Sequence, residues 1–263
     1  RIIEASQQLY LKQLNITDQN GLVYKSAQDK YKQINHYIEI LSTLLKELPN
    51  HEVIQVVDMG CGKGYLTFAI YDYLNHILKR PSEVVGVELR KDLVDLCNQI
   101  AHDSTYTGLQ FKQGSIEAFD IPEINVLIAL HACDTATDDA IAKGIKAHAD
   151  LIVVAPCCHK QIRKEINKNN VSNDLDFLLK HGIFMEREAE MVTDGIRALI
   201  LEYFGYTTKV IEFISDAHTH KNVMIVGKKN VQKESNQAAI KQKIIDIKSY
   251  FGIDHHHLER ILD

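Results

Sequence analysis

The chain of 263 residues is 45% hydrophobic and 25% charged, with a formal net charge of −5. This composition excludes an intrinsically disordered chain, and the mild negative charge excludes a surface coated with basic residues. No apolar run approaches the ~18 residues that a membrane span requires, so no membrane partner is expected. The five cysteines are an odd number and no signal peptide opens the chain, which favours a cytoplasmic location. Because the sequence starts at Arg1 rather than Met, a fragment of a longer protein is expected.

Short apolar runs alternate with helical stretches along most of the chain. In 25–48, apolar residues recur every three or four positions, and the first fifty residues are predicted to be helical. The predicted strands are Val53–Met59, Val84–Glu88, Leu109–Gln113, Asn125–Leu130 and Leu151–Ala155. The predicted helices that follow them are Tyr65–Leu78, Asp92–His102, Asp138–His148, Gln161–Ile166, Asp174–His181 and about Glu188–Phe204. Thr208–Ile214 and Asn222–Gly227 flank a short turn, which predicts a hairpin.

Strands rich in Val and Ile that are separated by helices predict βαβ units and a parallel sheet buried on both faces. The expected fold is α/β, a Rossmann-like sheet of five parallel strands closed by an antiparallel hairpin. Three segments are expected: N-terminal helices in 1–50, a cofactor-binding domain in 51–230, and a C-terminal helical tail in 231–263.

A glycine-rich turn separates the first predicted strand from the next helix, in the sequence VVDMGCGKGYL at 56–66. Gly60, Gly62 and Gly64 allow a tight turn and let a ligand approach main-chain N–H groups. The second strand ends at Glu88, 24 residues beyond Gly64, where a ribose diol needs a carboxylate acceptor. This pattern predicts a nucleoside-containing cofactor. The alternative is a turn that only packs a helix against a strand.

Asp58 decides between two classes of cofactor. An acid at this turn would repel the pyrophosphate of NAD, but it can receive the ammonium of S-adenosylmethionine, which has no pyrophosphate. We therefore predict S-adenosylmethionine as the cofactor. The residues expected to hold it in the turn and the second strand are Asp58, Gly60, Cys61, Gly62, Gly64 and Glu88. Lys32 or Gln33, from the preceding helix, is expected to cover its methionine end.

The third strand is expected to lie at the edge of the adenine ring. Ser115 is the predicted weak acceptor for the adenine amine, unless Glu117 or backbone groups take that role. Ile116 is expected on the face of the ring. A plain polar turn is the alternative interpretation.

The loops after the fourth and fifth strands carry His131, Cys133, Cys157, Cys158 and His159, which are expected to cluster on the substrate side. One interpretation is a zinc site, although adjacent cysteines differ from the usual Cys-x-x-Cys spacing. The second is catalysis, with His131 as the preferred general base and His159 as the other candidate. The third is a structural role, with the thiols packed as small apolar groups. Taken one by one, these residues favour the structural role, and no metal site is predicted.

Positive charge follows the fifth strand. Lys160, Arg163, Lys164 and Lys168 are interrupted only by Glu165, so this short helix could hold phosphates or could be a solvated face. Further along, Asp194 is expected to cap the start of the last long helix. Arg197 is expected either to reach a phosphate or to pair with a nearby acid.

Four segments together resemble the methyltransferase-domain family: 28–35 (QDKYKQIN), 58–66 (DMGCGKGYL), 130–138 (LHACDTATD) and 156–159 (PCCH). Its eukaryotic members include methyltransferase-like proteins, an rRNA adenine dimethylase domain-containing protein, and the C-terminal part of a glutathione S-transferase C-terminal domain-containing protein. The segments 133–138, 156–159 and 194–197 are also similar to tRNA 2′-O-methyltransferases of the acceptor stem. The resemblance covers about 25–228. Two features depart from it: Asp134 stands where the family usually has glycine, and the Cys/His zinc fingers of the tRNA enzymes are missing.

The resemblance implies a class I methyltransferase sheet and dependence on S-adenosylmethionine. Through the tRNA enzymes it also implies an RNA substrate, so RNA is the expected partner and no obligate protein partner is expected. One alternative is a methyltransferase of a protein or small molecule, and a second is a module that binds S-adenosylmethionine without turnover. An NAD-dependent oxidoreductase is a third class, which Asp58 and the hairpin oppose.

Overall fold

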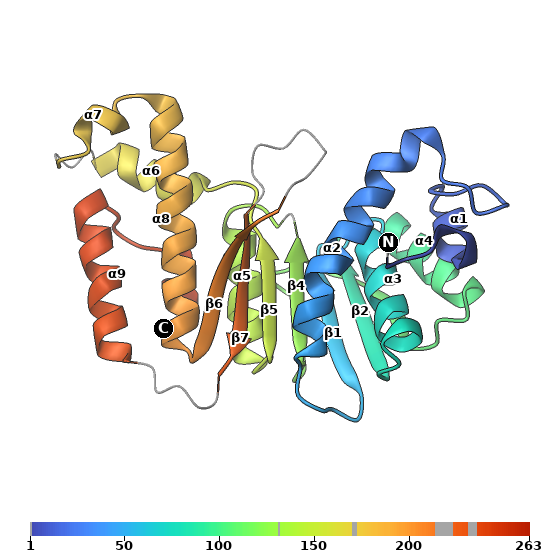
Figure 1. Cartoon of the computed structure of the whole chain (residues 1–263). Coiled ribbons are helices and arrows are strands. Elements are labelled where there is room, and N and C mark those ends of the chain that lie inside the picture. Colours follow the sequence, from blue (N-terminus) through green and yellow to red (C-terminus); the bar gives the residue numbers. More distant parts are fainter. Residues whose placement is uncertain (1, 131, 170–172, 214–222, 231–235) are drawn as a thin grey trace. The chain divides into compact units, whose positions relative to one another are not determined.

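The computed structural model describes residues 2–130, 132–169, 173–213, 223–230 and 236–263 (Figure 1). Its strands form a seven-stranded sheet in the order β3-β2-β1-β4-β5-β7-β6. The strands are β1 (Ile54–Met59), β2 (Ser82–Glu88), β3 (Leu109–Gln113), β4 (Val126–Leu130), β5 (Leu151–Ala155), β6 (Tyr206–Glu212) and β7 (Val223–Lys229). The predicted α/β class, with parallel strands and an antiparallel hairpin, is confirmed.

The chain divides into two compact units, one ending at Leu130 and one made of the described residues from Ala132 onward, apart from 214–220. In the first unit, β1 pairs in parallel with β2 and β4, and β2 pairs in parallel with β3. Its helices are α1 (Leu9–Gln13), α2 (Gln28–Lys46), α3 (Tyr65–Asp72), the π-turn η3 (Tyr73–Ile77) and α4 (Lys91–Asp103), with short 3₁₀ turns η1 (Ala5–Gln7) and η2 (Lys25–Ala27). The division into the segments 1–50, 51–230 and 231–263, expected from the sequence, stays a prediction.

The N-terminal segment is less helical than predicted. Between α1 and η2 the chain turns at Gly21, which has a φ of +80°, and Thr17 bridges to Val23 as in an antiparallel sheet. A Cβ on Gly21 would lie 2.4 Å from the backbone of Ser6, so only glycine fits this turn. The predicted helix over 25–48 is confirmed, because its buried face carries the apolar residues of that repeat.

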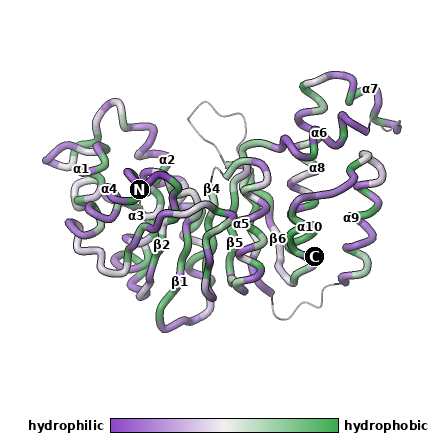
Figure 2. Tube along the Cα trace, turned by 180° about the vertical axis from the view of Figure 1, so that it is seen from behind, coloured by the Kyte–Doolittle hydropathy of each residue, from purple (hydrophilic) through white to green (hydrophobic). Residues whose placement is uncertain are grey.

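In the second unit, β5 and β6 both pair with β7 in antiparallel fashion. Its helices are α5 (Thr135–Lys146), α6 (Lys160–Asn169), α7 (Asp176–Leu179), α8 (Gly182–Tyr203), α9 (Gln237–Phe251) and α10 (His257–Leu262). Figure 1 shows α8 running beside β6 and α9, which agrees with its packing against both. Figure 2 shows hydrophobic residues along β1 and β5, where nearly every residue is buried.

The predicted helix cap at Asp194 is wrong. Helix α8 begins at Gly182, so Asp194 lies within it and is buried. Its carboxylate accepts a hydrogen bond from Arg197, one turn further along, rather than from the backbone N–H groups of a helix start. Among the helices that the structure describes, none has the length and hydropathy needed to cross a bilayer.

Candidate functional site

The glycine turn after β1 depends on three residues in the left-handed region. Gly60, Gly62 and Gly64 have φ values of +72°, +57° and +69°. The N–H groups of Gly60 and Cys61 both donate to the carbonyl of Val87, at 2.8 and 3.1 Å. Gly64 then starts α3 as its N-cap residue. The turn is therefore anchored to the end of β2, and a residue with a side chain would be strained at each of the three positions.

Gly62 also leaves free space beside the turn. A Cβ placed on Gly62 would have no heavy atom within 4 Å, whereas one on Gly64 would lie 2.8 Å from Phe111. Gly64 is thus required by packing inside the protein, and Gly62 borders an open region. An open region beside main-chain N–H groups is what a nucleoside ligand needs for close approach.

Asp58 lies buried at the end of β1, with 4% of its surface exposed. Its Oδ2 accepts a hydrogen bond from the hydroxyl of Thr67 at 2.7 Å. Burial raises the pKa of Asp58 to about 7, against a smaller lowering by Thr67. A buried carboxylate in this condition is stabilised by a cation, which is the property needed to receive an ammonium group.

Glu88 points back toward the glycine turn. Its Oε2 accepts from the N–H of Gly62 at 2.9 Å, and its Oε1 accepts from the N–H of Arg90 at 3.0 Å. Two backbone donors therefore fix the carboxylate, and each oxygen keeps lone-pair capacity for a ligand hydroxyl. Glu88 therefore contacts the turn directly, while its predicted role as acceptor for a ribose diol stays a prediction.

Ile116 lies over the turn, because a Cβ on Gly60 would be 3.7 Å from its Cδ1. Ser115 has a local partner, since its hydroxyl accepts from the N–H of Ala118 at 3.2 Å. The structure thus brings Ile116 to the same turn as Asp58 and Glu88. It also gives Ser115 a role in shaping its own loop, while its contact with adenine stays a prediction.

Phe111 and Gly86, which no sequence motif indicated, support the glycine turn through close packing. Phe111 on β3 fills the space under Gly64 and contacts Phe68, with ring centroids 5.2 Å apart. Gly86 on β2 makes room for both Phe111 and Cys61, because a Cβ there would lie 2.5 and 2.9 Å from them. Burial raises the pKa of the Cys61 thiol, so Cys61 packs as a neutral group. A glycine in the middle of an apolar strand is the sequence signal for this close approach.

The two residues predicted from α2 each have a partner on their own helix. Lys32 pairs with Asp29 on its own helix at 3.6 Å, and its side chain is half exposed. Gln33 accepts a hydrogen bond from Lys30 at 2.6 Å, and the Lys30 ammonium lies 5.5 Å from the ring centroid of Tyr65. Lys30 is therefore an α2 side chain that contacts the residue following the glycine turn, and Gln33 is its hydrogen-bond partner.

In the second unit, three thiols converge from two loops. The sulfur atoms of Cys133, Cys157 and Cys158 all lie within 4.8 Å of one another, and the Sγ atoms of Cys133 and Cys157 are 2.6 Å apart. Cys133 is exposed and the other two are partly buried, and none forms a disulfide. Burial raises the pKa of Cys157 to about 12, and the Cys133 thiol adds to the rise. The predicted clustering of these cysteines is observed.

Behind the thiols lies a buried polar network. The Nε2–H of His159 donates to Asp194 Oδ1 at 3.0 Å, and Arg197 donates to Asp194 at 2.9 Å and to Asp138 at 2.7 Å. The side chains of His159 and Arg197 are each 1% exposed. Arg197 therefore pairs with buried acids, which is one of its two expected roles, and His159 is held by Asp194. The candidate role of His159 in catalysis stays a prediction. His131 lies outside the described residues, so its catalytic role stays a prediction.

The same network joins the two thiol-bearing loops. Arg197 donates to the backbone carbonyl of Asp134 at 2.8 Å, and Asp134 Oδ1 accepts from the N–H of Gln161 at 3.0 Å. Asp134 has a φ of +54°, in the region that favours glycine. The aspartate that replaces the family's usual glycine thus keeps a glycine-like backbone, and its side chain links the loop after β4 to the start of α6.

The basic helix α6 is only partly available to a ligand. Ile162 and Ile166 bury one face of the helix. Arg163 forms an ion pair with Glu186, and Lys168 pairs with Asp254 at 3.4 Å. Lys160 and Lys164 are exposed one turn apart. The structure therefore leaves these two lysines as the better candidates for a phosphate contact.

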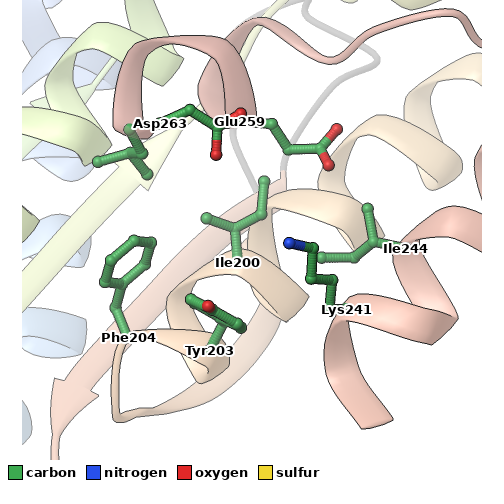
Figure 3. A pocket seen from close by; sticks show the side chains of 8 residues that line it. Ile200, Tyr203, Phe204, Lys241, Ile244, Glu259 and Asp263 are labelled. Carbon is green, nitrogen blue, oxygen red and sulfur yellow. The ribbon is translucent and has the colours of Figure 1, made fainter. Parts of the chain in front are cut away.

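A separate pocket lies among α8, α9 and α10 (Figure 3). It has a volume of about 80 Å³, and Ile200, Tyr203, Ile244, Lys241 and Glu259 are among its lining residues. Cofactor sites usually occupy about 300–1,000 Å³, so this pocket is too small for one. None of its lining residues belongs to the predicted site.

Comparison with known proteins identifies the family. A model of the family described as "Methyltransferase domain" matches residues 29–165, more than half of the chain. The glutathione S-transferase C-terminal domain-containing proteins of Homo sapiens and Bos taurus are each 25% identical over 223 residues, covering 76% of this chain and 33% of theirs. The chain thus spans about a third of the length of these relatives. The solved CMeT domain of citrinin polyketide synthase is 14% identical, with a TM-score of 0.49 and coverage of 75% of this chain and 53% of that one.

Proposed function

The chain belongs to the methyltransferase-domain family, and from this membership we propose that it transfers the methyl group of S-adenosylmethionine to an RNA. The observation that carries the cofactor assignment is the direct contact of Glu88 with Gly62, next to the buried carboxylate of Asp58. Together they offer an acceptor for ribose hydroxyls and an anion for an ammonium group on the two sides of one glycine turn. The open space at Gly62 fits a ligand of this kind.

When bound, S-adenosylmethionine supplies a methyl group on a sulfonium, which a nucleophile can displace in line. The protein then has to hold the cofactor and the acceptor in line and take up a proton. Asp58 would bind the ammonium, Glu88 would accept hydrogen bonds from the ribose hydroxyls, and Ile116 would cover the adenine beside the turn. His131 is the candidate general base.

The RNA substrate is supported by the positive charge of α6. Lys160 and Lys164 are exposed on one side of this helix, where they can neutralise phosphates. Their position directly after the loop that carries Cys157 and Cys158 links this charge to the loops that follow β4 and β5. The proposal also follows the resemblance expected from the sequence between these loops and those of tRNA 2′-O-methyltransferases.

The experiment that tests this function is transfer of tritiated methyl groups from S-adenosylmethionine into fractionated lysate, counted with and without RNase. Label that RNase releases supports the proposal. Label that survives RNase moves the acceptor to a protein or small molecule. Binding of the cofactor without transfer into any fraction would favour a module without turnover.

A charge reversal tests the RNA contact. The double variant Lys160→Glu, Lys164→Glu should weaken RNA binding at low salt, because two phosphate contacts become repulsive. Arg163 is left unchanged because it pairs with Glu186. The matched control is Lys209→Glu with Lys243→Glu, two exposed lysines on β6 and α9 whose reversal changes the net charge equally. If both double variants lose RNA affinity equally, the loss comes from the change in net charge, and α6 has no specific role in RNA binding.

A further inference from the structure

The three-cysteine cluster has a geometry that neither of its loops shows alone. Cys157 and Cys158 are adjacent in sequence, so their spacing gives no metal-binding motif. The structure adds a third sulfur from Cys133, 24 residues earlier, and all three sulfur atoms lie within 4.8 Å of one another. Among the described residues, this is the one group of three or more His, Cys, Asp or Glu side chains close enough to share a metal ion.

The distances suit a thiophilic metal. Tetrahedral zinc has bonds to sulfur of about 2.3 Å, which place its sulfur ligands about 3.8 Å apart. The cluster lies within reach of that spacing, and the Cys133–Cys157 pair would open by about 1 Å to accept the ion. Cys133 is exposed, so an ion at the cluster can be reached from solvent and can take water as its fourth ligand.

Buried hydrogen bonds hold the two loops that carry the thiols. Arg197 binds the carbonyl of Asp134, next to Cys133, and through Asp194 it is linked to His159, next to Cys158. Metal sites depend on such outer hydrogen bonds to orient their ligands. The buried network therefore presents three sulfur atoms from two loops at a single point.

We propose that Cys133, Cys157 and Cys158 form a binding site for zinc or a similar thiophilic divalent ion, with an exchangeable fourth ligand. Binding replaces three S–H bonds by three metal–sulfur bonds and releases three protons, and no group is oxidised or reduced. The competing assignment, a disulfide between Cys133 and Cys157, would use two of the three thiols and would require an external oxidant. This site does not depend on the proposed methyl transfer, and its test does not use that activity.

The test is metal content of the full chain, purified under reducing conditions and reconstituted with zinc. We expect about one zinc ion per chain, and reconstitution with cobalt should give the thiolate-to-metal charge-transfer absorption and the intense visible bands of tetrahedral cobalt. The Cys133→Ser variant should lose the ion and these bands. Since Cys133 is exposed, this variant is expected to fold, which circular dichroism would verify.

The matched control is Cys97→Ala, which removes a buried thiol from α4 in the first unit and should keep one ion per chain. Absence of zinc and cobalt binding in the wild-type protein with all thiols reduced would overturn the proposal. It would also be overturned if Cys133→Ser bound metal as wild type does. Peptide mapping of protein purified without reductant would detect a disulfide between Cys133 and Cys157. If that disulfide is found and the reduced protein also fails to bind metal, the two thiols form a redox pair and the metal site is overturned.

Discussion

The glycine turn after β1 and the thiol-bearing loops after β4 and β5 are built in different ways. The turn gets its shape from three glycines at positive φ within five positions and from hydrogen bonds to the end of β2, which follows it in the sequence. The thiol-bearing loops get theirs from Arg197 on α8, which is 63 residues from Asp134 and 59 residues from Asp138. One site is therefore encoded locally, and the other exists only when a distant helix has packed.

This difference has consequences for the behaviour of each site. A substitution in the turn should act on cofactor binding and on local strain. A substitution in the Arg197 network should lower the stability of the second unit, because it leaves a buried charge without its partner of opposite charge. The effects predicted below follow from this contrast.

The largest effect is expected for Arg197→Met. Removal of the buried guanidinium leaves the carboxylates of Asp138 and Asp194 without their cation, which should cost about 3–5 kcal/mol of unfolding free energy. Chemical denaturation, followed by circular dichroism, measures this loss. The matched variant is Arg163→Met, whose guanidinium is half exposed and pairs with Glu186. It should cost about 0–1 kcal/mol, and an equal loss in both variants would contradict the importance of burial.

Two glycine substitutions separate packing from ligand space. Gly64→Ala should cost about 2–4 kcal/mol of stability, because it adds a left-handed residue and a clash with Phe111. Gly62→Ala should cost about 1–2 kcal/mol, from strain alone. Its affinity for S-adenosylmethionine, measured by calorimetry, should nevertheless fall by about ten-fold or more, since the methyl group enters the open space beside the turn. Unchanged affinity in Gly62→Ala would show that the ligand does not approach there.

The fold could be predicted from the sequence because its signals are periodic and local. Apolar runs of β1 to β5 and the repeat of α2 gave elements whose ends lie within a few residues of the observed ones. The cap of α8 was predicted wrongly because Asp194 has the side chain of a typical cap residue, although it lies within the helix. The pairing of Asp194 with Arg197, one turn further along, follows one of the two expectations for that arginine. Its contact with His159 becomes visible only when the helix packs against the loop after β5.

The candidate cofactor site was predictable to a similar degree, and the thiol site was not. The order strand, glycine turn, helix, strand, acid in 54–88 predicted that Glu88 belongs to the same site as the glycine turn, and the hydrogen bond from the Gly62 N–H to Glu88 was added by the structure. The supporting roles of Phe111 and Gly86 needed the register between β2 and β3. The meeting of Cys133 with Cys157 and Cys158 could be expected from neighbouring strand ends, but the sulfur distances that allow a metal could not.

The charge of Asp58 predicts a pH dependence of cofactor affinity. With a pKa of about 7 in the free protein, the carboxylate is protonated as the pH falls below 7, and affinity for an ammonium should fall about ten-fold between pH 8 and pH 6. Asp58→Asn removes this dependence and should bind weakly at both values. Because the amine of the ligand titrates equally for both proteins, the ratio of their affinities isolates Asp58.

The stability of the free protein should change in the opposite direction. The folded-state pKa of Asp58 is raised above its ordinary value of 3.8, so its contribution to stability is fully present below that value and is lost as the pH rises toward 7. Denaturation midpoints of wild type and Asp58→Asn should therefore diverge as the pH increases from about 4 to about 7, with the variant losing less. A constant difference across this range would contradict the raised pKa.

The smallest effect on stability is expected at Ser115, which shapes its own loop and is also the predicted acceptor for the adenine amine. Ser115→Ala removes the acceptor for the Ala118 N–H and should cost about 0.5–1 kcal/mol of stability. Ser115→Asp keeps that acceptor and adds a charged oxygen that can take a hydrogen bond from the adenine amine, so affinity for S-adenosylmethionine should rise by about three- to ten-fold. Ser249→Asp adds the same charge on the exposed face of α9 and should leave affinity unchanged. If Ser115→Asp also leaves it unchanged while Ile116→Ala lowers it, the ring lies over Ile116 and its amine faces other groups.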